Sequence, residues 1–63
     1  MMTKMELMDL CFIVWRLLPR EIRDTYSYDT GLLGFIRMVA TLAKFDFNKL
    51  TYEELDLFIQ YLT

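Results

Sequence analysis

Apolar residues recur at spacings of three and four along most of this chain, and this periodicity limits the possible fold more than any other feature. The first series lies between residues 7 and 18 and comprises Leu7, Leu10, Cys11, Val14, Leu17 and Leu18. Such spacing places the side chains on one face of an α-helix. No segment alternates between apolar and polar residues as a half-buried strand does. The fold is therefore expected to be all-α.

The boundaries of the first helix are marked by capping signals. Thr3 and Glu6 have the spacing of a capping box, in which each side chain accepts a hydrogen bond from the backbone amide of the other residue. Pro19 excludes the helical conformation at Leu18 and ends the helix there. The first helix is predicted at about 3–18. The same proline can open a short helical turn at 19–24.

Two further helices are predicted from the same kind of pattern. The segment 30–44 repeats apolar residues at helical spacing: Leu32, Phe35, Ile36, Val39, Leu42 and Ala43. A second capping box, Thr51 with Glu54, opens a helix at 52–62. That helix is expected to bury Leu55, Phe58, Ile59 and Leu62 and to keep its opposite face polar. The sequence thus predicts a single domain over 1–63, a three-helix bundle.

The segment 25–30, which follows the short helical turn, has no regular period and is predicted to be a loop. Asp29 or Thr30 is expected to cap the helix that follows. Tyr26 and Tyr28 are expected to hold the loop against the core.

The apolar content exceeds what a chain of this length can bury. A domain of 63 residues hides only about 60% of its unfolded surface. Yet 56% of the residues are apolar, against a usual ~45–50%. The apolar sector of the first helix spans roughly 220° of its circumference, where a core-facing stripe needs little more than ~100°. Part of this surface is expected to be exposed or covered by a partner.

We predict a partner-binding site on the flank of the first helix that carries Met8, Phe12 and Trp15. Methionine and aromatic residues are enriched at the centres of protein interfaces. The alternative is that Trp15 fills the core of the monomer. Arg16 lies beside this flank and, with Arg20 and Arg23, suits either an acidic partner or a solvated surface. Gly34 is a second candidate contact, because a missing side chain permits close approach, although it also fits as a tolerated glycine near a helix start.

The residue types that most catalytic and metal sites need are missing. The chain has no histidine and one cysteine, Cys11, which lies in an apolar stripe where the pKa of its thiol should rise. Zinc needs several Cys or His ligands. The segment from Asp46 lacks the glycine and the final acid of a calcium-binding loop. We therefore expect neither an enzyme, nor a cofactor, nor a metal, nor a small-molecule substrate.

Charge and cysteine content bear on partners and location. The net charge of −2 argues against direct nucleic-acid binding. Glu53, Glu54 and Asp56 form an acidic patch that stabilises a helix N-terminus or docks onto a basic surface. A single cysteine and no secretory signal favour a cytoplasmic location. The uncharged run from Leu10 to Trp15 is far shorter than the ~20 residues that span a membrane.

These features together favour a non-enzymatic protein-interaction module, a small regulator or inhibitor of a larger protein. Its size also fits the small regulatory proteins of phages and mobile elements, by analogy alone. Three alternatives are a homodimer subunit, a peripheral membrane protein and an acidic mimic of nucleic acid.

Overall fold

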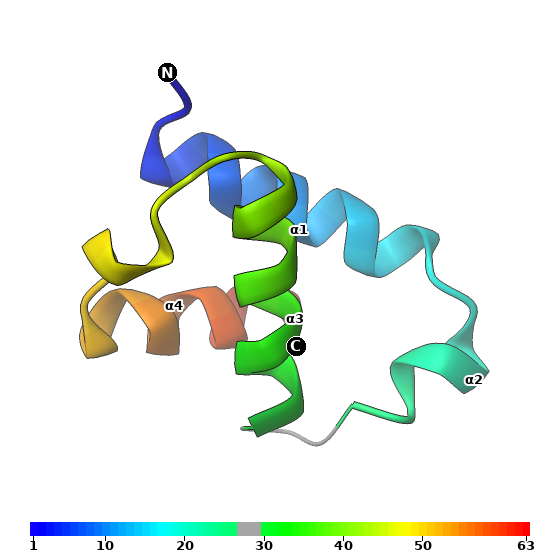
Figure 1. Cartoon of the computed structure of the whole chain (residues 1–63). Helices are drawn as coiled ribbons and strands as arrows, with labels where there is room; N and C mark the ends of the chain where they lie inside the picture. The colour runs from blue at the N-terminus through cyan, green and yellow to red at the C-terminus, as the bar shows by residue number, and fades with distance from the viewer. Residues whose placement is uncertain (27–29) are drawn as a thin grey trace.

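The protein is a small bundle of α-helices, and its computed structural model describes residues 1–26 and 30–63. The helices are α1 (Lys4–Leu17), α2 (Arg20–Arg23), α3 (Thr30–Leu42) and α4 (Tyr52–Leu62), with one 3₁₀ turn, η1 (Phe47–Lys49). In Figure 1, α3 runs across α1 and α4, and these three helices pack pairwise against one another. The short α2 lies at the edge of the molecule and buries no side chain. The predicted all-α fold is confirmed.

The predicted limits of α1 agree with the structure to within one residue. The amide of Glu6 donates to Oγ1 of Thr3 (3.1 Å), and the amide of Thr3 donates to Oε1 of Glu6 (2.9 Å), so the capping box is complete. Leu18 has the extended conformation expected before a proline, with ψ 138°. Pro19 then caps α2, because its carbonyl accepts from the amides of Ile22 and Arg23.

The loop before α3 is tied to the core by Tyr26, as predicted. Its ring lies against Trp15 and Phe35, with both centroid separations 5.6 Å. Asp29, one predicted cap of α3, and Tyr28 lie outside the described residues. The other predicted cap, Thr30, is the first residue of the helix itself.

The C-terminus of α3 closes with a left-handed residue. Lys44 has φ 58°, and the amide of Phe45 donates to the carbonyl of Ala40 (2.8 Å) while the amide of Lys44 donates to that of Thr41 (3.1 Å). This pair of bonds is the Schellman motif, which usually contains glycine at the left-handed position. The helix therefore ends at Leu42, two residues before the predicted limit.

The core is formed by three helices and one residue of the loop before α4. Its buried members are Leu7, Cys11, Trp15, Leu32, Phe35, Ile36, Val39, Ala40, Leu50, Leu55, Phe58, Ile59 and Leu62. No polar or charged residue is buried in the described part of the chain. Leu17 and Leu42, both predicted in apolar stripes, are instead 77% exposed. Each is the last residue of its helix, where the chain turns away from the neighbouring helices.

Candidate functional site

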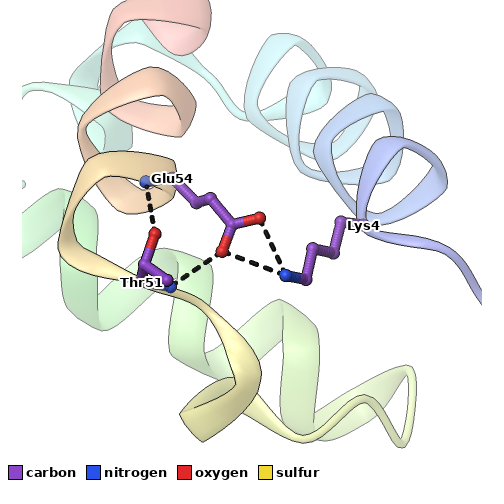
Figure 2. Close-up of polar contacts among 3 residues, drawn as sticks. All are labelled: Lys4, Thr51 and Glu54. Atoms are coloured by element: carbon purple, nitrogen blue, oxygen red, sulfur yellow. Dashed lines mark hydrogen bonds and ion pairs between the residues drawn. The ribbon is translucent and has the colours of Figure 1, made fainter.

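The helices α1 and α4 lie side by side and run in the same direction, although they are far apart in the sequence. At their N-terminal ends, Nζ of Lys4 lies 2.8 Å from Oε2 of Glu54 and 3.1 Å from Oε1. Figure 2 shows that the same carboxylate also accepts a hydrogen bond from the backbone amide of Thr51 (2.9 Å). The hydroxyl of Thr51 in turn accepts a hydrogen bond from the backbone amide of Glu54 (3.1 Å). The second predicted capping box is therefore present, and a lysine of α1 completes it.

These contacts lower the pKa of Glu54. The largest cause is the hydrogen bond from Lys4, followed by the one from the backbone of Thr51. The Lys4 side chain is 47% exposed and that of Glu54 is 30% exposed, so solvent screens the pair. Glu54 belongs to the predicted acidic patch, but its carboxylate already forms an ion pair with Lys4 of the same chain.

Replacing Glu54 by glutamine is expected to make the fold less sensitive to acid. A carboxyl group with a lowered folded-state pKa stabilises the fold above its unfolded value, and this contribution is lost as pH falls through the folded value. Urea unfolding at about pH 7 and about pH 3 measures the free energy of unfolding on either side of this transition. We expect Glu54→Gln to narrow the difference in stability between the two pH values. Glu53→Gln is the matched control, because the side chain of Glu53 makes none of these contacts; equal narrowing in both variants would contradict the assignment.

A second set of contacts joins the two helices about two turns further on. The hydroxyl of Tyr61 donates to Oδ1 of Asp9 (3.3 Å). The rings of Phe12 and Tyr61 lie 5.0 Å apart between centroids, and the guanidinium of Arg16 lies 5.1 Å from the centre of the Phe12 ring. An aromatic cluster with a cation above it therefore closes this end of the α1–α4 contact.

Between these two ends, the surface is hollowed over about 270 Å³. The hollow is lined by Lys4, Met5, Met8, Glu54, Leu57 and Phe58. Met5 is 70% exposed and Leu57 is 56% exposed, whereas Phe58 at the base is buried. We call the apolar surface formed by Met5, Met8, Phe12, Leu57, Phe58 and Tyr61 the α1–α4 groove. It is the candidate functional site.

Three of the five predicted site residues lie at this groove. Met8 and Phe12 are half-buried at the junction of the two helices, and Arg16 is exposed above Phe12. The half-burial arises because α4 packs beside the flank of α1 that the sequence predicts to be free. Part of the predicted surface is therefore already covered by the chain itself.

The prediction that Trp15 lies on an exposed flank is wrong. Trp15 is buried, and its ring packs edge-on against Phe35 (5.1 Å between centroids) and Tyr26. The alternative, that Trp15 fills the core, is what the structure has. The physical reason is that α1 turns the edge of its wide apolar sector that carries Trp15 toward α3.

Gly34 does not lie at any close approach within the molecule. It is exposed on α3, and no heavy atom lies within 4 Å of the position that a Cβ would take. The interpretation as a tolerated glycine near a helix start therefore fits the structure, and the groove does not include it.

Sequence reasoning missed the α4 side of the site. The sequence predicts a single apolar face for the last helix, yet Leu57 and Tyr61 are exposed on a second one, with Tyr61 at 45%. Their spacing of four residues was the available signal, because such residues are neighbours on a helix surface. Met5, one turn before Met8, was missed in the same way.

Cys11 is fully buried, and burial raises the pKa of its thiol to about 11, the direction that the sequence predicts. Within residues 1–26 and 30–63, no group of three or more His, Cys, Asp or Glu side chains could hold a metal ion. No helix in that part of the chain has the length and apolar character needed to cross a membrane.

Comparison of the chain with models of protein families, with curated proteins and with solved structures gives no match. Any function assigned to the chain therefore rests on the groove and on its surroundings.

Proposed function

We propose that this chain is a protein-interaction domain that binds a larger protein through the α1–α4 groove and thereby regulates it. The observation that carries the proposal is the pairing of Met5 and Leu57, two well-exposed apolar side chains, across an apolar hollow. The core beneath is already complete, so these residues contribute little to folding. Methionine and aromatic side chains of this kind are typical of the centres of protein interfaces.

The shape of the groove favours a protein over a small molecule. Pockets for drug-sized ligands hold about 300–1,000 Å³ and enclose most of the ligand surface. The hollow between α1 and α4 measures about 270 Å³ and is bordered by exposed residues on both helices. A side chain of a partner fits such a depression, whereas a free ligand would stay largely in water.

The charges near the groove disfavour a membrane surface. Amphipathic helices that bind anionic lipid usually have lysine and arginine on their polar face. Here Asp9 accepts a hydrogen bond from Tyr61 of the groove, and Glu53 lies one helical turn before Leu57 on α4. The nitrogen of Lys4 is held by Glu54.

The substitution Leu57→Ser is expected to abolish partner capture while leaving the fold intact. Truncating a central interface residue commonly costs more than about 1.4 kcal/mol of binding free energy, which is tenfold in affinity. The measurement is affinity capture from lysate of the source cells, with captured proteins quantified by mass spectrometry for wild type and variant. Circular dichroism checks that both are equally helical.

Leu42→Ser is the matched control, because Leu42 is equally apolar and is exposed on α3 outside the groove. Proteins captured by the wild type and by Leu42→Ser, but depleted with Leu57→Ser, support the proposal. The same set of proteins recovered with all three chains would show that the groove is not the binding surface.

A further inference from the structure

The charge beside the groove is unevenly distributed between its two helices. α4 has Glu53, Glu54 and Asp56 and no basic residue, and no lysine or arginine occurs anywhere after Lys49. In the part of the chain that the structure describes, neither Glu53 nor Asp9 forms an ion pair. Among the described residues beside the groove, Arg16 on α1 is a cation that forms no ion pair, and its guanidinium lies over the Phe12 ring. The α4 edge of the groove is therefore negative.

A second copy of the chain is a poor match for this surface. Each copy has a net charge of −2, so two acidic α4 edges would face a partner of the same sign. A standard stable interface also buries about 800 Å² on each partner, roughly a sixth of the 4716 Å² surface of this chain. Of the six side chains of the groove, Met8 and Phe12 are half-buried and Phe58 is buried. The remaining exposed area suits a single inserted segment better than a dimer.

The groove is lined by a row of apolar side chains from each of two helices that run in the same direction. Met5, Met8 and Phe12 are separated by three and four residues, and Leu57 and Tyr61 by four. Residues i, i+3 and i+7 of a helix extend over about 10 Å along its axis. A partner helix lying along the groove would place its own apolar residues at the same intervals. The thioethers of Met5 and Met8 adapt to side chains of different shape.

We propose, on the basis of the protein-interaction function above, that the groove binds an amphipathic helical segment of the partner. The apolar side chains of this segment enter between α1 and α4, and its lysine or arginine side chains lie along the α4 edge near Glu53. Apolar contacts supply the affinity, and the charges set the orientation and reject acidic helices.

Two synthetic peptides of about 18 residues, or five helical turns, test the proposal directly. Both carry leucine at the same helical positions, and one has lysine and the other glutamate at the flanking positions. Fluorescence anisotropy with the full chain measures the dissociation constants at about 50 mM and about 300 mM salt. We expect the lysine peptide to bind at least about tenfold more tightly, with a difference that shrinks at high salt.

Four variants separate apolar docking from general attraction between charges. Leu57→Ser is expected to lower the affinity for the lysine peptide at least about tenfold, whereas Leu42→Ser leaves this affinity unchanged. Glu53→Gln is expected to reduce the preference for lysine by a few-fold. Glu21→Gln, which removes an exposed acid on α2, is the control for net charge.

Equal affinities for the lysine and glutamate peptides would contradict the proposed preference for a basic partner. An affinity for the lysine peptide that Leu57→Ser does not change would show that the peptide does not bind in the groove. A dimer in sedimentation equilibrium that dissociates on Leu57→Ser would assign the groove to a second copy instead. Failure of the peptides together with Leu57-dependent capture from lysate would overturn the helical partner while leaving the protein-interaction function in place.

Discussion

Replacing Phe35 by alanine is expected to remove a large part of the stability of the fold at 25 °C. Phe35 is the largest of the fully buried side chains, and its ring contacts both Trp15 and Tyr26. Removing a buried phenylalanine costs about 3–5 kcal/mol, because the transfer free energy is lost and a cavity remains. A domain of this length has a total stability of about 3–9 kcal/mol at typical values per residue. One substitution therefore removes at least about a third of the expected stability, and all of it at the lower end of that range.

Urea titration followed by far-ultraviolet circular dichroism measures this loss. Phe12→Ala is the matched control, because Phe12 is also an aromatic residue facing another ring, but it is only half-buried. We expect the control to stay folded with a modest decrease in the urea midpoint. A Phe35→Ala chain with a midpoint near that of the wild type would show that the aromatic cluster is not the centre of the core.

Replacing Trp15 by alanine is expected to have a comparable effect on stability, about 3–5 kcal/mol. Trp15 is buried against Tyr26 and Phe35, and edge-to-face aromatic pairs add to the free energy of burial. Trp15→Phe keeps a ring at this site and should lose only part of that stability. The expected order of urea midpoints is wild type, then Trp15→Phe, then Trp15→Ala.

This series also separates a core role from a partner-binding role. Trp15 is the single tryptophan of the chain, so the fluorescence of the wild type reports on the environment of this ring. Emission should shift to the red in urea together with the loss of helical signal. A Trp15→Ala chain that remains fully helical but no longer captures a partner would contradict the core assignment and place Trp15 at the interface.

The helices themselves were predictable because their signals are local. Each capping box, Thr3 with Glu6 and Thr51 with Glu54, starts a helix through hydrogen bonds made within four residues. Pro19 ends α1 by restricting its immediate neighbour, Leu18. None of these signals depends on the rest of the fold. The end of α3 was less predictable because a lysine, Lys44, occupies the left-handed position at which a glycine usually marks the stop.

The environment of Trp15 was not predictable from the sequence for a geometric reason. The apolar sector of α1 is wide enough that several rotations about the helix axis bury a sufficient stripe. The packing of α3 and α4 selects one rotation, and it places Trp15 inside and Met5 outside. Leu57 and Tyr61 could not be assigned to a site from the sequence, because they form the groove only together with α1, and the packing of α4 beside α1 is not apparent from the sequence. Two of the six groove residues, Met8 and Phe12, could be named in advance, together with Arg16 beside them.

Because α1 and α4 together form the groove, binding of a partner to the groove is thermodynamically coupled to folding of the chain. The walls of the groove come from segments about fifty residues apart, so the groove does not exist in the unfolded chain. A partner at 100 times its dissociation constant would add about 2.7 kcal/mol to the stability of the domain. That gain is a large fraction of the total stability of about 3–9 kcal/mol expected for a domain of this length. The fraction of chains exposed to proteases at any moment would then depend on the concentration of the partner.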